Sequence, residues 1–170
     1  MHIVAGRFVR MVELVKISQT GREKLEIELK ELEKELVEVK KRVAEAREQG
    51  DLKENGEYIY GREQQGFIEG RMGEIRGKIN HSEVVDCTKV TCETAEFGTI
   101  VTLKDINTKV KDTFQLLGPF DADIENDSIS IKSPVGEALL GMKVGEKSSV
   151  EIPRGMFEFE ILKIEASDIP

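Results

Sequence analysis

Apolar residues recur in a heptad pattern over the first third of the chain. From residue 25 to 46 they are spaced alternately four and three apart, with Glu and Lys between them: Leu25, Leu29, Leu32, Leu36, Val39, Val43 and Ala46. This spacing places one narrow apolar stripe along a helix. Ser18 is a candidate N-cap, and Gly50 is a candidate C-terminal stop. The pattern predicts one helix of roughly 30 residues, on the order of 45 Å long.

The same spacing resumes after Gly50 and Asp51. The second set of seam residues is Tyr58, Gly61, Gln65, Ile68, Met72, Ile75 and Ile79. Because so short a connection leaves no other arrangement, the two helices are expected to pack antiparallel. A stripe this narrow suits a two-helix seam and would leave a compact bundle poorly filled. The sequence therefore predicts a protruding coiled-coil hairpin over residues 18–85, with its tip at residues 50–55.

Glycines are frequent in the second predicted helix. They are Gly56, Gly61, Gly66, Gly70, Gly73 and Gly77. Each costs about 1 kcal/mol relative to Ala in a helix interior. Two interpretations stay open: the glycines let the two backbones approach closely, or they make the helix more plastic near the tip.

Short β-rich runs follow a change of composition around residues 84–93. Most alternate apolar with polar residues, as half-buried antiparallel strands do. They cover residues 98–103, 112–117, 128–132, 147–152 and 157–164. Between the third and fourth runs, Pro134 and Gly141 bracket one short helix. We therefore predict an α+β fold, in which the hairpin precedes a small antiparallel sheet with one helix. The expected division is an N-terminal extension (1–17), the hairpin (18–85), a linker (86–92) and a C-terminal domain (93–170).

Net charge and composition exclude several classes of protein. The formal charge of −8 argues against a protein that coats nucleic acid, because that mode needs a net basic surface. Residues 1–85 are nearly neutral, with 16 Lys and Arg against 17 Asp and Glu, whereas residues 86–170 have 9 against 16. No apolar run approaches the roughly 18 residues of a membrane span. The two cysteines and two histidines form no metal-ligand or disulfide pattern, and we expect a cytoplasmic protein with reduced thiols.

Two carboxylates, Asp51 and Glu54, stand three residues apart at the predicted turn, on the same face of a helix start. Mg²⁺ prefers oxygen ligands and is typically held by one or two carboxylates together with phosphate oxygens of a substrate. The pair is therefore half of a metal site. The same spacing is also an Asp-led capping box, which a helix N-terminus favours without any further function. Both interpretations stay open, and they are compatible.

Basic and aromatic side chains flank the same turn. Arg47, Lys53 and Arg62 could contact nucleic-acid phosphates, or they could form an ordinary solvated helix surface with ion pairs four residues apart. Tyr58 falls on the seam and is expected to pack, whereas Tyr60 points elsewhere and could stack on a base. The chain alone contains no complete active site.

Three stretches of the chain match patterns of a known family. Two of them closely resemble the hairpin-tip signature of the bacterial Gre transcript-cleavage factors, of the GreA type. They are residues 44–58 (AEAREQGDLKENGEY) and residues 62–71 (REQQGFIEGR). Residues 133–141, SPVGEALLG, resemble the helix motif of that family's C-terminal domain, which is FKBP-like in fold. The resemblance covers about residues 16–165. Gly56 departs from the family pattern, which has Ala there, and about ten residues before Met11 have no counterpart.

The resemblance implies a function. Gre factors bind bacterial RNA polymerase at its secondary channel, dock outside through the C-terminal domain and reach the active centre with the coiled coil. By this resemblance, Asp51 and Glu54 help to hold a Mg²⁺ shared with the polymerase and position a water that cleaves backtracked RNA. The chain is then a monomeric cofactor in a DNA-bound transcription complex, not an enzyme and not a membrane protein. The implied nascent-RNA contacts are Arg47 and Arg62, to which the residues around the turn add Lys53 and Tyr60 as candidates. The implied polymerase-docking residues are Ser133 and Pro134.

Three alternatives stay open. The first is a Gre-like factor that occupies the channel and inhibits the polymerase without stimulating cleavage, although the intact Asp51 and Glu54 weigh against it. The second is a peptidyl-prolyl isomerase or chaperone, which needs an aromatic-lined proline pocket. Residues 86–170 contain five phenylalanines for such a pocket but no Tyr or Trp. The third is a structural coiled-coil adaptor, which would not require the paired carboxylates.

Overall fold

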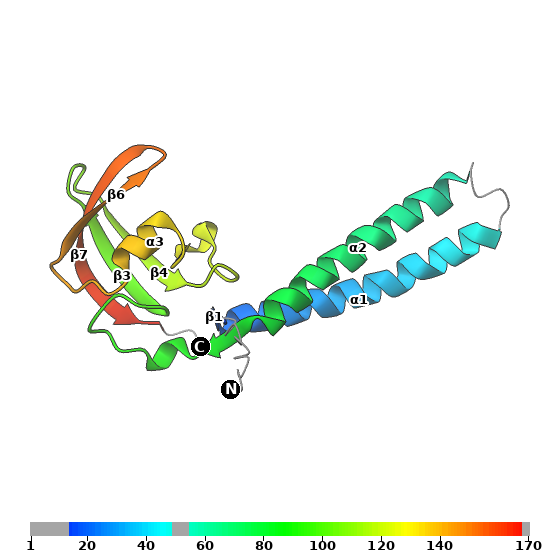
Figure 1. Ribbon diagram of the computed structural model, residues 1–170, viewed down its shortest axis with the longest axis horizontal. Helices are drawn as coiled ribbons and strands as arrows, with labels where there is room; N and C mark the ends of the chain where they lie inside the picture. The colour runs from blue at the N-terminus through cyan, green and yellow to red at the C-terminus, as the bar shows by residue number, and fades with distance from the viewer. Residues whose placement is uncertain (1–13, 49–54, 168–170) are drawn as a thin grey trace, which may run out of the picture.

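A long helical hairpin projects from a small α+β domain in the computed structural model (Figure 1), which describes residues 14–48 and 55–167. The hairpin consists of α1 (Gln19–Glu48) and α2 (Gly56–Asn80). Ser18 caps α1, because its Oγ accepts a hydrogen bond from the backbone N–H of Gly21 at 2.9 Å. The predicted hairpin is confirmed. No helix among the described residues is long and apolar enough to cross a membrane.

The predicted seam residues form the core of the hairpin. One cluster near the base contains Leu25 and Ile75, and a second, further along, contains Val39, Ile68 and Met72. Ion pairs bridge the two helices on either side of this seam: Arg71–Glu28 at 2.7 Å, Arg76–Glu33 at 3.0 Å and Lys40–Glu69 at 3.5 Å. Exposed pairs of this kind each contribute roughly 0–1 kcal/mol, so the apolar seam supplies most of the stability.

The glycines of α2 do not share one role. A Cβ on Gly61 would lie 2.7 Å from Cγ2 of Val43 on α1, so this glycine does let the helices approach closely. A Cβ on any of the others would have no atom within 4 Å: Gly56, Gly66, Gly70, Gly73 and Gly77. The close-approach interpretation therefore holds for Gly61 and not for these five positions.

Strands β1 (Val15–Ser18) and β2 (Ser82–Val85) form a parallel pair at the base of the hairpin. This pair was not among the predicted strands, and β1 begins within residues 1–17, the predicted N-terminal extension. A short 3-10 helix (Cys87–Lys89) follows in the predicted linker, with Cys87 buried against Phe97 and Leu117. The division of the chain into domains stays a prediction, and residues 1–13 lie outside the described residues.

The second part of the molecule is a five-stranded sheet in the order β5-β4-β3-β7-β6. Its strands are β3 (Thr99–Asp105), β4 (Lys111–Leu117), β5 (Ser128–Ser130), β6 (Lys147–Ile152) and β7 (Gly155–Ala166). Each of the five overlaps one of the predicted runs, although β3, β4 and β7 extend beyond theirs. Helix α3 (Pro134–Leu139) packs with them around a core that includes Leu139 and Phe159. The α+β prediction is confirmed.

The sheet is mixed, although the alternating pattern predicted antiparallel strands. Three of its strand pairs are antiparallel, but β4 and β5 are parallel. Parallel neighbours need a crossover that returns the chain to the same end of the sheet. Residues 118–127, which include a second 3-10 helix (Ile124–Asn126), form that connection, called the crossover below.

Alanine substitutions separate the two kinds of glycine. Gly70→Ala and Gly73→Ala are each expected to raise the free energy of unfolding of the hairpin by up to about 1 kcal/mol, because Ala gains helix propensity in open space. Gly61→Ala is expected to gain less than either, because Val43 must move. Urea denaturation followed by circular dichroism at the helix band measures all three. An equal gain for Gly61→Ala would show that the contact with Val43 is not tight.

Candidate nucleic-acid interface near the hairpin tip

Asn55 joins the two helices next to the tip. Its Oδ1 accepts a hydrogen bond from the N–H of Tyr58 at 3.1 Å, which makes it the N-cap of α2. Its Nδ2 donates to the carbonyl oxygen of Ala46 at 2.7 Å, close to the last turn of α1. The capping-box interpretation of Asp51 and Glu54 falls outside the described residues, and the cap that the structure shows for α2 is Asn55. Asn55 has both a donor and an acceptor, so one side chain satisfies backbone groups of both helices.

The carboxylates predicted to hold a metal, Asp51 and Glu54, lie outside the described residues, and so does Lys53. The described residues contain no group of three or more His, Cys, Asp or Glu that could hold a metal ion. The metal-ligand prediction therefore stays a prediction. The structure does describe the surface of α1 and α2 that adjoins the turn in sequence.

A cleft of about 560 Å³ lies along one side of the hairpin near its tip. Its lining residues come from both helices: Lys40, Val43, Ala44, Arg47 and Glu48 from α1, and Tyr58 and Arg62 from α2. The cleft thus gathers three cationic side chains and one carboxylate. It brings together Arg47 and Arg62, which flank the turn in the sequence, and it adds Lys40, which was not among the predicted site residues.

The two arginines of this basic cleft form no ion pair with a carboxylate among the described residues. Arg62 donates to Oε1 of Gln65 at 2.9 Å. Lys40 is paired with Glu69. The pKa of Glu69 lies below its ordinary value, chiefly because Gln65 donates a hydrogen bond to it and also because Lys40 and Arg62 lie near. Arg47 and Arg62 can therefore offer their guanidinium groups to an anion.

The two tyrosines lie on different sides of the hairpin. Tyr60 lines a separate cleft of about 320 Å³, together with Arg42, Glu45 and Glu57. Because two carboxylates face one cation there, this second cleft is a poorer site for phosphate. Tyr58 is half-buried in the basic cleft beside the arginines. The spacing of four residues between Tyr58 and Arg62 was the signal that could have placed them on one face.

Comparison with known proteins identifies the family. The family description "Transcription elongation factor, N-terminal" matches residues 15–84, and "Transcription elongation factor, GreA/GreB, C-term" matches residues 90–166. The chain belongs to the GreA/GreB family of transcription elongation factors. The resemblance seen in the tip and α3 motifs is thereby confirmed.

Individual relatives agree over nearly the whole chain. Transcription elongation factor GreA of Desulfotalea psychrophila is 40% identical over 159 residues, which cover 93% of this chain and 99% of that protein. Transcription elongation factor GreA of Thermodesulfovibrio yellowstonii is 43% identical over 155 residues, covering 91% and 98%. Among solved structures, GreA factor homolog 1 of Thermus thermophilus is 26% identical and covers 90% of this chain and 99% of that one. Its TM-score of 0.42 is too low to carry an argument.

The predicted docking residues of this GreA/GreB family member lie at the start of α3. Ser133 caps the helix: its Oγ accepts from the N–H of Gly136 at 3.1 Å and donates to the carbonyl oxygen of Ser130 at 2.6 Å. Pro134 follows in the first turn and is exposed. The Ser133 side chain is thus occupied within the fold, and Pro134 is the member of the pair that offers free surface. Both lie in the sheet domain, far from the hairpin tip (Figure 1).

Substitutions at Asn55 test its double role. Asn55→Ala removes the bonds to Tyr58 and Ala46 and is expected to lower the free energy of unfolding by roughly 1–2 kcal/mol. Asn55→Asp keeps the acceptor for Tyr58 but loses the donor to Ala46, so it reports on the second bond alone. Urea denaturation gives the stabilities, and hydrogen exchange of the Tyr58 amide reports the cap directly. If Asn55→Ala were as stable as the parent, these bonds would not hold the helix ends.

Proposed function

We propose that this protein binds bacterial RNA polymerase and stimulates its Mg²⁺-dependent cleavage of backtracked nascent RNA, which rescues arrested complexes. The observation that carries the proposal is the basic cleft, where Arg47 and Arg62 lie free of ion pairs among the described residues, next to the turn that bears Asp51 and Glu54. Membership of a family of transcription elongation factors supports it.

The arginines of the cleft would bind the RNA backbone. A guanidinium group forms two parallel hydrogen bonds to a phosphate, and such charge-assisted bonds are stronger than neutral ones. Arg47 and Arg62 come from opposite helices, so together they can hold a strand that runs beside the tip. Lys40 adds positive charge further down the same cleft, and Tyr58 offers an aromatic ring. RNA contacts by Lys53 and Tyr60 stay predictions.

Asp51 and Glu54 would complete the site at the tip. Carboxylate oxygens suit Mg²⁺, which usually keeps few protein ligands and takes others from phosphate. When bound between the polymerase and this chain, the metal would stabilise the attacking and leaving oxygens of the phosphodiester. The chain itself lends only ligands and orientation. It therefore acts as a cofactor of the polymerase rather than as an enzyme.

The length of the hairpin suits a remote target. At about 1.5 Å per residue, the 30 residues of α1 span roughly 45 Å. Such an arm can carry two carboxylates into a channel while the sheet domain stays outside. The exposed Pro134 then belongs to the docking surface, and a partner in the bacterial cytoplasm is expected. The protein would act as a monomer, since the polymerase supplies the rest of the site.

The phenylalanines favour this role over that of an isomerase. A proline pocket needs aromatic rings that face an open groove. Here each of the five rings of the C-terminal half packs in a core cluster: Phe114, Phe157 and Phe159 in the sheet core, Phe97 beside Cys87, and Phe120 against the hairpin base. Their packing role accounts for them without a substrate.

Neutralising the tip carboxylates separates cleavage from channel binding. Asp51→Asn combined with Glu54→Gln is expected to leave polymerase binding intact and to abolish the release of short RNA fragments from a backtracked complex in Mg²⁺. Gel analysis of end-labelled RNA measures release, and competition with labelled parent protein measures binding. Full cleavage by the double variant would refute the metal-lending role. If the parent itself bound without cleaving, the channel-binding inhibitor would be the better description.

Removing the arginines of the basic cleft tests the RNA contact. Arg47→Ala and Arg62→Ala should each lower the cleavage rate roughly tenfold, because a hydrogen bond to a charged group contributes about 1.5–3 kcal/mol. The matched control is Arg42→Ala, which removes the same charge from the opposite cleft. Cleavage rates at saturating protein give the comparison. Equal losses from all three substitutions would indicate a general charge effect and not a contact in this cleft.

A further inference from the structure

The crossover of the sheet domain (residues 118–127) contacts the base of the hairpin. The backbone N–H of Ser18 donates to Oδ2 of Asp121 at 2.7 Å, across 103 residues of sequence. Ser18 ends β1 and caps α1, so Asp121 lies at the N-terminus of the longer helix. A carboxylate at this end of a helix is stabilised by the unpaired N–H groups and the helix dipole.

Two glycines allow the close approach of these segments. A Cβ on Gly21 in α1 would lie 2.4 Å from Cβ of Asp121. A Cβ on Gly118 in the crossover would lie 2.0 Å from the carbonyl oxygen of Lys16 in β1. Neither distance is compatible with a side chain, so each partner in the contact has a glycine where the other comes closest.

An aromatic ring extends the contact to α2. Phe120 packs against the base cluster of Ile17, Leu25 and Ile75, which includes residues of both helices. The ammonium group of Lys78 in α2 lies 5.8 Å from the centroid of the Phe120 ring, within the range of a cation–π interaction. The crossover therefore contacts β1, α1 and α2 together.

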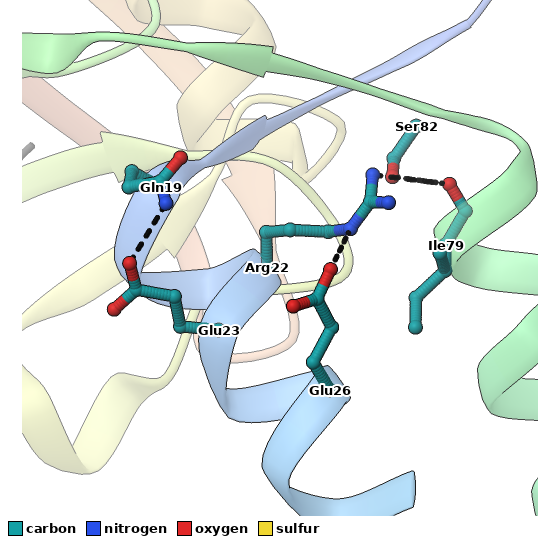
Figure 2. A network of polar contacts seen from close by, with 6 residues as sticks. All are labelled: Gln19, Arg22, Glu23, Glu26, Ile79 and Ser82. Carbon is teal, nitrogen blue, oxygen red and sulfur yellow. Dashed lines mark hydrogen bonds and ion pairs between the residues drawn. The ribbon is translucent and has the colours of Figure 1, made fainter.

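The base that receives the crossover is itself held together by polar contacts. Figure 2 shows Arg22 reaching from the first turn of α1 toward the end of α2, where its Nη1 donates to the carbonyl oxygen of Ile79 at 3.4 Å. The same arginine pairs with Glu26 at 2.9 Å, and Ser82 of β2 donates to Ile79 at 3.0 Å. These contacts link both helices and β2. A displacement of Ser18 relative to the sheet domain would therefore move both helices together.

We propose that Asp121 is a positioning residue that fixes the direction of the hairpin relative to the sheet domain. This inference rests on the proposed function, since the direction matters only if the tip must meet a target. Over an arm of roughly 45 Å, a tilt of about 10° at the base would move the tip by about 8 Å. Metal ligands must be placed to within about 0.5 Å. A firm contact at the base is thus required for Asp51 and Glu54 to act.

The chemistry of Asp121 fits a positioning role better than a generic packing role. Its Oδ2 makes the bond to Ser18, whereas its Oδ1 is buried and has no hydrogen-bond partner among the described residues. Burying an unsatisfied carboxylate oxygen is costly. An apolar residue would avoid that cost if the contact served stability alone, but it could not accept the bond from Ser18.

A distance measurement on the free protein tests the contact. Cys92 is exposed and can carry one spin label, while Cys87 is buried and burial raises the pKa of its thiol to about 11, which protects it from labelling. Lys41→Cys supplies the second site on α1, near the tip. Double electron–electron resonance then gives the distribution of distances between the domain and the arm.

Four variants are compared with the labelled parent. Asp121→Ala and Gly21→Ala are expected to broaden or shift the distance distribution, because one loses the bond and the other forces the segments apart. Asp121→Asn keeps an acceptor for Ser18 and should largely retain the parent distribution. Glu125→Gln is the matched control, since it removes the same charge from an exposed position of the same crossover. Circular dichroism confirms that each variant is folded.

Cleavage assays with the same variants link the contact to function. Asp121→Ala should lower the cleavage rate at saturating protein at least tenfold while its half-saturating concentration changes less than twofold; Glu125→Gln should match the parent. An unchanged distance distribution in Asp121→Ala and Gly21→Ala overturns the proposal, and so does a changed distribution with normal cleavage. If the parent does not cleave RNA, the proposed function fails, and the distances still decide whether Asp121 sets the arm.

Discussion

A single apolar seam holds the hairpin together beyond its base. Val39, Ile68 and Met72 bury their side chains between two helices and have no third element to cover them. Only one narrow stripe of each helix is therefore buried along this part of the hairpin, and the other faces, which carry the exposed Val37 and Phe67, are open to solvent. This allows the hairpin to be long and to carry polar clefts on both of its sides near the tip. A wider apolar face would have required further helices to cover it, and the hairpin would then be a bundle.

Local patterns predicted most of the fold because they determine most of it. The heptad spacing determines both helices, the alternation determines five strands, and Pro134 with Gly141 marks α3; Gly141 indeed has a positive φ of 81°. The parallel pair β1–β2 and the parallel pairing of β5 with β4 were not predicted. Their runs are short, and their pairing depends on contacts between distant segments, such as Ile17 with Phe120. The pattern of apolar residues around Ile17 or around Phe120 cannot predict that the two side chains meet.

The site near the hairpin tip could also be predicted only in part from local sequence patterns. Arg47 and Arg62 flank the turn in sequence and do meet in one cleft, so that part of the prediction was accessible. The spacing of Asp51 and Glu54 offered a capping box as one interpretation, whereas the cap that the structure shows for α2 is Asn55, which also donates to Ala46. That second bond joins the two helices, and a pattern within one helix cannot reveal it. The metal-binding role of Asp51 and Glu54 stays a prediction.

Stiffness is distributed unequally between the two helices. The glycines of α2 at positions 66, 70, 73 and 77 are spaced four, three and four apart and face open space, so they weaken the helix without touching the seam. In α1 the only glycine is Gly21, in the first turn, where Asp121 approaches. The contact of Asp121 is thus made with the helix that has fewer helix-weakening glycines. A direction set at Ser18 is transmitted along α1 to Arg47, and α2 follows through the seam and Asn55.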